Sequence, residues 1–162
     1  MRLHIAALAL ALAACSPAPI PTEQPAQGEA ATHAPAEALT AIKAQLPGFL
    51  ATSAVSDNST GAQGYRVSGT QGGSSYEVQL LRMNEGWTVV AIRRDIAWAD
   101  APQVVREAAA AMPGAMQPTR VVENRQPGAE GVIYELYGAG AEAPTVEVRF
   151  ADGQAAVMPA PH

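Results

Sequence analysis

Few side chains in this sequence have the types and spacing that catalysis requires. The chain of 162 residues contains one cysteine and three histidines. His4 precedes an apolar run, His33 lies in a proline-rich stretch, and His162 is the last residue. None of them is close to an element that could orient it beside a serine or cysteine nucleophile. We therefore expect a protein that is not an enzyme and has no catalytic residues.

Metal and cofactor sites are not indicated either. No pair of Cys or His residues has zinc spacing, and no Asp-rich calcium loop is present. Asp95 and Asp100 flank Trp98 and could at most begin a weak oxygen site. A salt bridge and the N-cap of the following helix, at Asp100, explain them better. Gly69 and Gly72-Gly73 are followed by neither a helix nor a lysine, so they predict no phosphate loop. We expect no metal and no cofactor.

Partner-binding residues are better indicated than catalytic ones. Trp and Arg are enriched at the centres of protein interfaces. One segment, from Arg93 to Trp98, carries both types, and Tyr137 precedes a Gly-Ala-Gly turn. Arg93, Arg94, Trp98 and Tyr137 are therefore the candidate partner-binding residues. Packing of Trp98 against the next helix, with both arginines solvated along a strand edge, is the alternative.

The N-terminus has the layout of a secretory leader. A short basic start precedes an apolar run, Ile5 to Leu12, which is too short to cross a membrane. The run leads into Leu12-Ala13-Ala14-Cys15, which resembles the lipobox of bacterial lipoproteins. The resemblance implies cleavage before Cys15, lipidation of that cysteine with acyl chains such as palmitate, and, because Ser16 follows, an outer-membrane position facing the periplasm. An ordinary signal peptide with a chance cysteine is the alternative.

Charge argues against nucleic acid and anionic lipid head groups as partners. The chain has ten basic and fifteen acidic residues, a net charge of −5, and Lys43 is its only lysine. Both of those partners need clustered Lys and Arg. The one basic pair, Arg93-Arg94, is followed at once by Asp95. We expect an extracytoplasmic protein or peptide partner instead.

Composition and hydrophobic periodicity divide the chain into five parts. They are a leader (1–14), the lipidated cysteine with a tether (15–35), two repeats (36–98 and 99–158) and a tail (159–162). The tether is rich in Pro, Ala, Gln and Glu, shows no apolar periodicity, and could extend over about 60 Å.

Each repeat opens with an amphipathic helix that a Pro-Gly pair stops. An offset of 66 residues places Leu46 over Met112 and the first Pro-Gly pair over the second. Alternating apolar residues after each helix predict about three antiparallel strands per repeat. The first repeat carries eight extra residues between its first two strands, in the region Ser56 to Ser75. We expect this region to be a long polar loop, either functional or disordered.

This succession of elements resembles the PepSY and PepSY-like domains. The second repeat carries the pattern best, in Ala101 to Gly114, Val121-Val122-Glu123, Tyr134-Glu135-Leu136, Val146 to Phe150 and Asp152-Gly153. The first repeat departs from it, with the long polar region and with Glu85-Gly86 in place of Asp-Gly. The tandem is similar to secreted β-lactamase-inhibitor proteins, which consist of two such repeats. The resemblance implies an α+β fold whose helices cover one face of an antiparallel sheet, and binding or inhibition of extracytoplasmic enzymes and other ligands by the sheet surface.

Together these features predict a non-enzymatic, periplasm-facing lipoprotein that binds or inhibits a protein or peptide partner. A structural accessory lipoprotein of an envelope complex is the alternative. A small-ligand-binding or enzymatic role comes third.

Overall fold

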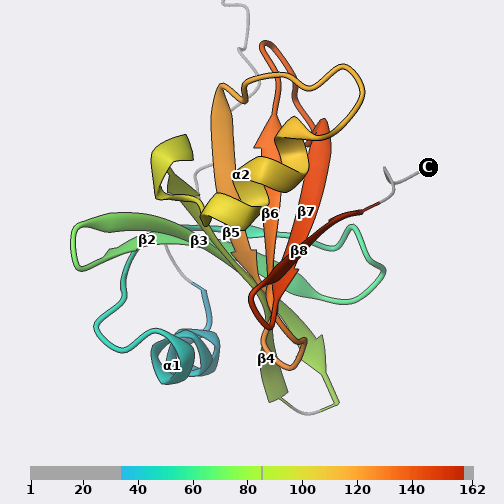
Figure 1. Cartoon of the computed structure of the whole chain (residues 1–162). Coiled ribbons are helices and arrows are strands. Elements are labelled where there is room, and N and C mark those ends of the chain that lie inside the picture. The colour runs from blue at the N-terminus through green and yellow to red at the C-terminus, as the bar shows by residue number, and fades with distance from the viewer. Residues whose placement is uncertain (1–33, 85, 159–162) are drawn as a thin grey trace, which may run out of the picture.

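The computed structural model describes residues 34–84 and 86–158, which form one sheet and two helices (Figure 1). The elements are α1 (Ala36–Gln45), β1 (Leu50–Ser56), β2 (Gly64–Gln71), β3 (Ser74–Met83), β4 (Gly86–Ile96), the short 3-10 helix η1 (Trp98–Asp100), α2 (Gln103–Ala110), β5 (Arg120–Arg125), β6 (Val132–Tyr137), β7 (Val146–Ala151) and β8 (Gln154–Met158). The strands are neighbours in sequence order from β1 to β8, and every pair is antiparallel. The sheet is therefore an open meander.

The predicted α+β fold class is wrong, because the molecule is mainly β. The two helices have ten and eight residues, whereas one continuous sheet of eight strands runs through the described chain. Two physical features explain the error. Each helix is shorter than its Ala-rich apolar pattern suggested, and each is followed by four strands instead of three. The division into two repeats at residue 98 stays a prediction.

Helix α1 forms where alanine and long unbranched side chains dominate. Its buried positions are four residues apart, at Ala38 and Ile42, and Leu46 continues the same face. Glu37 in the first turn and Lys43 in the last turn suit the helix dipole. The chain turns away at Gly48, which has a φ of 81° that only glycine adopts at little cost.

Helix α2 begins later than the sequence suggested. Asp100, the predicted N-cap, lies in η1, and the N-cap position is Pro102. Pro102 makes this start favourable because its fixed φ suits the helix entrance. Helix α2 buries Val105 and Ala109, again four residues apart.

The predicted loop from Ser56 to Ser75 contains a strand. Strand β2 lies inside it and pairs with β1 on one side and β3 on the other. Its Ser, Gly and Thr content concealed an alternation in which Val67 and Gly69 are buried. The ring of Phe49 occupies the space in which a Cβ at position 69 would lie, so glycine is the residue that fits there. Strong β-formers are therefore unnecessary here, since pairing on both sides holds the strand.

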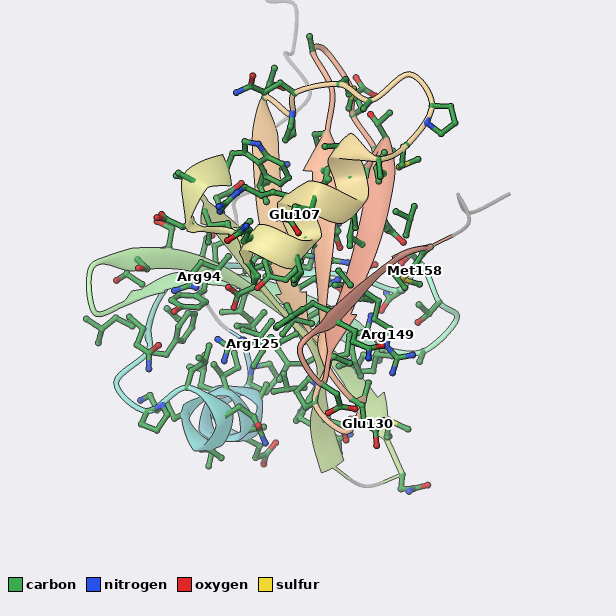
Figure 2. All side chains as sticks on the ribbon, viewed as in Figure 1. Arg94, Glu107, Arg125, Glu130, Arg149 and Met158 are labelled. Carbon is green, nitrogen blue, oxygen red and sulfur yellow. The ribbon has the colours of Figure 1, made fainter. Side chains whose placement is uncertain are left out.

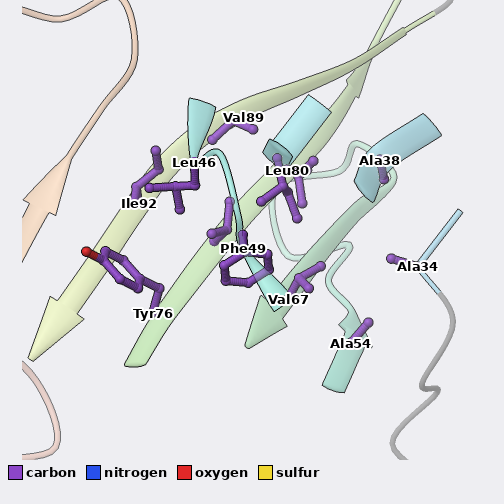
Figure 3. Packing of buried hydrophobic residues seen from close by; sticks show 12 residues of the cluster. Ala34, Ala38, Leu46, Phe49, Ala54, Val67, Tyr76, Leu80, Val89 and Ile92 are labelled. Carbon is purple, nitrogen blue, oxygen red and sulfur yellow. The ribbon is translucent and has the colours of Figure 1, made fainter. Parts of the chain in front are cut away.

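Two hydrophobic clusters lie on the same face of the sheet. The first packs α1 against β1 to β4, and Phe49 lies near its centre beside Val67 and Leu80 (Figure 3). The second packs α2 against β5 to β8. Cross-strand partners share a face, and Val78 pairs with Ile92 while Ile96 pairs with Val121. Both helices therefore cover one face and leave the other uncovered.

The β4–β5 pairing joins these two parts of the sheet. It runs from Ile92 opposite Arg125 to Ile96 opposite Val121. On the helix side, Arg94 lies between the clusters and bonds to Glu123 at 2.8 Å. Figure 2 shows Arg94 and Arg125 in the space between α1 and α2. A polar seam, not a shared apolar core, therefore occupies this face where the clusters meet.

Candidate functional site

The face of the sheet opposite the helices is the candidate functional site, and we call it the uncovered face. Its side chains follow from the register, since Glu77 pairs with Arg93, Arg93 pairs with Asn124, and Val122 pairs with Glu135. Most of the positions are polar or charged, in contrast to the two hydrophobic clusters of the other face. Of the described elements, neither α1 nor α2 packs on this face.

Two adjoining hollows mark the middle of the uncovered face. One, of about 300 Å³, reaches from Thr52 and Ser68 to Arg120. The other, of about 420 Å³, reaches from Arg66 to Glu147. The two hollows share four lining residues, namely Glu77, Arg93, Arg120 and Val122. They therefore form one continuous depression across the central strands.

Glu135 is the centre of a hydrogen-bonded cluster on the floor of this depression. Its carboxylate accepts bonds from Asn124 Nδ2 at 2.7 Å, from the Tyr137 hydroxyl at 3.0 Å and from Arg93 Nε at 3.4 Å. Arg93 also approaches Glu77 at 3.7 Å. Three donors thus converge on one carboxylate, and one of them is cationic.

The burial of this cluster is unusual for a face that neither α1 nor α2 covers. Asn124 is 3% exposed and Glu135 is 5% exposed, and Val122 beside them is 2% exposed. Charged and amide groups are rarely this buried unless they are paired. The hydrogen bonds within the cluster offset the cost of this burial.

Tyr137 and Arg120 form the rim of the cluster. Burial, together with the Glu135 carboxylate, raises the pKa of Tyr137 to about 12. The guanidinium of Arg120 lies 4.9 Å from the centre of the Tyr137 ring. Arg120 also donates to both carboxylate oxygens of Asp95, at 2.6 and 3.4 Å. The bidentate pair and the ring contact hold this arginine at the edge of the depression.

The structure separates the four residues predicted to bind a partner. Arg93 and Tyr137 meet through Glu135 on the uncovered face. Arg94 points to the helix side, where its bond to Glu123 raises its pKa. Trp98 lies in η1 and packs against the second cluster. Adjacent strand residues point to opposite faces, so the side chains of Arg93 and Arg94 leave the sheet on different sides, although both residues line the first hollow.

Three members of the site escaped the sequence-based prediction, namely Asn124, Glu135 and Arg120. Glu135 lies between Tyr134 and Leu136, so the strand alternation did assign it to the polar face. Nothing in that alternation indicates burial, because burial depends on neighbours that the sheet register brings together. A carboxylate followed two residues later by tyrosine on the same face was the only signal available.

The described residues, 34–84 and 86–158, contain no group of three or more His, Cys, Asp or Glu side chains that could hold a metal ion. Within the same ranges, no helix is long and apolar enough to span a membrane. Cys15, His33 and His162 lie outside the described residues, as do the predicted leader and the tail. The cluster supplies ion pairs and hydrogen bonds on a hollow surface.

Comparison with known proteins finds no match for this chain. No protein-family model matches the chain, and no curated protein or solved structure is significantly similar to it. The resemblance to PepSY-like domains stays a prediction from the sequence.

Proposed function

We propose that this protein is a lipid-anchored, non-enzymatic binding protein of the bacterial cell envelope that captures a protein partner on the uncovered face. The observation that carries the proposal is a buried, ordered charge cluster on that face. Asn124 and Glu135 are each at most 5% exposed there although both helices lie on the other side. A preorganised polar surface loses little side-chain entropy when a partner binds.

The charges of the depression favour a protein over other partners. Its second hollow is lined by three arginines and three glutamates, Arg66, Arg93, Arg120, Glu77, Glu135 and Glu147. Nucleic acid and anionic membranes need positive charge that is not already neutralised. A protein surface with both acidic and basic side chains matches this mixture of charges. Its side chains can form ion pairs with the arginines and glutamates of the depression.

The N-terminal sequence supports the anchored form of the proposal. Acyl chains on Cys15 would hold the protein at a membrane without a spanning helix. The Pro-rich residues 16–35 would let the sheet reach a partner about 60 Å away. The most specific version of this proposal is inhibition of an extracytoplasmic enzyme.

Affinity capture from envelope extracts tests the proposal with two charge reversals. Arg120→Glu changes a half-exposed rim residue, whereas Lys43→Glu changes an exposed residue of α1 on the other face. We expect Arg120→Glu to lower recovery of one stoichiometric partner at least tenfold and Lys43→Glu to leave it unchanged. Circular dichroism establishes that both variants are folded.

The identity of the captured partner separates the forms of the role. A soluble enzyme whose activity falls on binding supports inhibition. A stable membrane complex of fixed stoichiometry supports the structural accessory role instead. Equal recovery with both variants would show that the uncovered face is not the binding surface.

A further inference from the structure

A third hollow lies on the same uncovered face, towards the other end of the sheet. It measures about 200 Å³ and lies where β5 to β8 meet the loop between β5 and β6. Its lining residues are Asn124, Gln126, Ala129, Glu130, Gly131, Ile133, Arg149 and Met158. Figure 2 shows Glu130, Arg149 and Met158 on one side of the molecule.

Asn124 brings a buried, unpartnered acceptor to this hollow. Its Nδ2 donates to Glu135, which does not line the hollow, and its Oδ1 has no hydrogen-bond partner among the described residues. The whole residue is 3% exposed. Buried acceptors without a donor are uncommon in folded proteins because each costs free energy.

The orientation of the Asn124 amide follows from the chemistry of its neighbour. The Glu135 carboxylate oxygens accept bonds from Arg93 and Tyr137, and the Asn124 amide reaches the same carboxylate through Nδ2. The NH₂ group of Asn124 must therefore face Glu135. The carbonyl oxygen is therefore the atom of this amide that lacks a hydrogen-bond partner.

Arg149 brings donors to the opposite wall. Asn124 pairs with Ile133 on β6, and Ile133 pairs with Arg149 on β7. Asn124 and Arg149 are therefore two strand spacings apart, a distance of about 10 Å. One Arg149 nitrogen donates to the Glu130 carbonyl at 3.1 Å, which holds the guanidinium beside the loop. Its other N–H groups lie on an exposed side chain.

We propose that this hollow binds a carboxamide group of the partner, as carried by a Gln or Asn side chain. The carboxamide N–H donates to Asn124 Oδ1, and its C=O accepts from Arg149. The methylene groups pack on Ile133 and Met158. The inference rests on the proposed function, since it names which group of the partner occupies this end of the uncovered face.

Other polar groups fit this pair of walls less well. A carboxylate satisfies Arg149 but turns a second acceptor towards Asn124 Oδ1. An ammonium group satisfies Asn124 but lies close to the Arg149 cation. A carboxamide carries one donor and one acceptor in a single plane, which matches both walls.

Nuclear magnetic resonance of the full chain in detergent tests the site with small probes. Propionamide reproduces the end of a glutamine side chain, while propionate and propylammonium have similar size and a different charge. We expect propionamide to shift the side-chain signals of Asn124 and Arg149 saturably. Propionate and propylammonium should bind at least about tenfold more weakly, since each leaves one wall unpaired.

Two exposed arginines of the same face supply matched variants. Arg149→Ala should weaken propionamide binding about tenfold, whereas Arg66→Ala, which changes another hollow, should leave it unchanged. Non-saturable shifts, or equal affinity in both variants, would overturn the inference. So would a preference for propylammonium, which would assign the hollow to a cationic side chain. None of these results depends on partner capture, so the proposed function can stand if the inference fails.

Discussion

Glu135 shows how one side chain can organise a surface. It is buried on the uncovered face, and Arg93, Asn124 and Tyr137 all donate to it. Glu147 lies directly opposite it on β7. Like charges in directly opposed positions of a sheet repel each other. We therefore expect the two glutamates to have opposite effects on stability.

We expect Glu135→Gln to lower the free energy of unfolding by about 1–3 kcal/mol, because it removes the carboxylate that accepts from three donors, two of them on buried residues. Glu147→Gln is the matched control. It should raise the free energy of unfolding by about 0.5 kcal/mol through relief of repulsion. Urea denaturation followed by circular dichroism measures both values. Equal effects of the two variants would show that the cluster does not order this face.

Tyr137 predicts a pH dependence in the alkaline range. Its hydroxyl donates to Glu135, and its pKa rises from 10.0 to about 12 in the folded protein. Between pH 10 and pH 12 the unfolded chain would lose this proton while the folded chain keeps it. The stabilisation is thus complete below pH 10 and is lost as pH rises towards the folded pKa.

The free energy of unfolding should therefore fall more steeply between pH 10 and pH 12 in the wild type than in Tyr137→Phe. Denaturation at several pH values measures the difference, and ultraviolet difference spectra assign the titrating phenol. Parallel pH profiles in the two proteins would contradict the burial of this hydroxyl.

At the scale of elements, β2 depends on close packing more than on strand propensity. A Cβ on Gly69 would overlap the Phe49 ring and the Leu50 carbonyl oxygen. We expect Gly69→Ala to destabilise the protein by about 1–3 kcal/mol through overpacking. Gly86→Ala is the control, since nothing lies within 4 Å of its Cβ position. Thermal denaturation compares them, and similar melting temperatures would mean that Phe49 does not pack over β2.

The elements that the sequence predicted correctly have strong local patterns. Tyr76, Val78 and Leu80 alternate along β3, and Asp152-Gly153 marks the turn into β8. Strand β2 was missed because its burial comes from Phe49 and from pairing with two neighbours, which no local pattern records. The prediction of the fold class was wrong for the same reason, because the fold class depends on the number of strands and β2 was not predicted.

The candidate site was predictable only in part. Alternation places Arg93 and Tyr137 on one face, and the structure joins them through Glu135. Arg94 belongs to the other face by the same alternation. Asn124 gave no local signal, because its role depends on the β4–β5 and β5–β6 registers. Long-range register therefore decides which polar residues form the cluster.

At the scale of the whole molecule, the proposal joins a sheet with one uncovered face to a lipid anchor. Cys15→Ala removes the only cysteine. We expect the wild-type chain to sediment with membranes and to resist salt extraction, because several acyl chains bind a bilayer strongly. The variant should appear in the soluble envelope fraction. Mass spectrometry should find lipid on the wild-type chain alone, and a soluble wild type would contradict the anchor.

The central claim is that the uncovered face, not the helix side, contacts the partner. Photo-crosslinking from single positions in living cells tests it most directly. Ser75 lines the depression, whereas Gln45 is exposed at the end of α1 on the helix side. We predict that a photoreactive residue at position 75 gives one discrete crosslinked species that Arg120→Glu abolishes, and that position 45 gives none. Crosslinking from position 45 alone, or crosslinking from position 75 that Arg120→Glu does not change, would contradict the account.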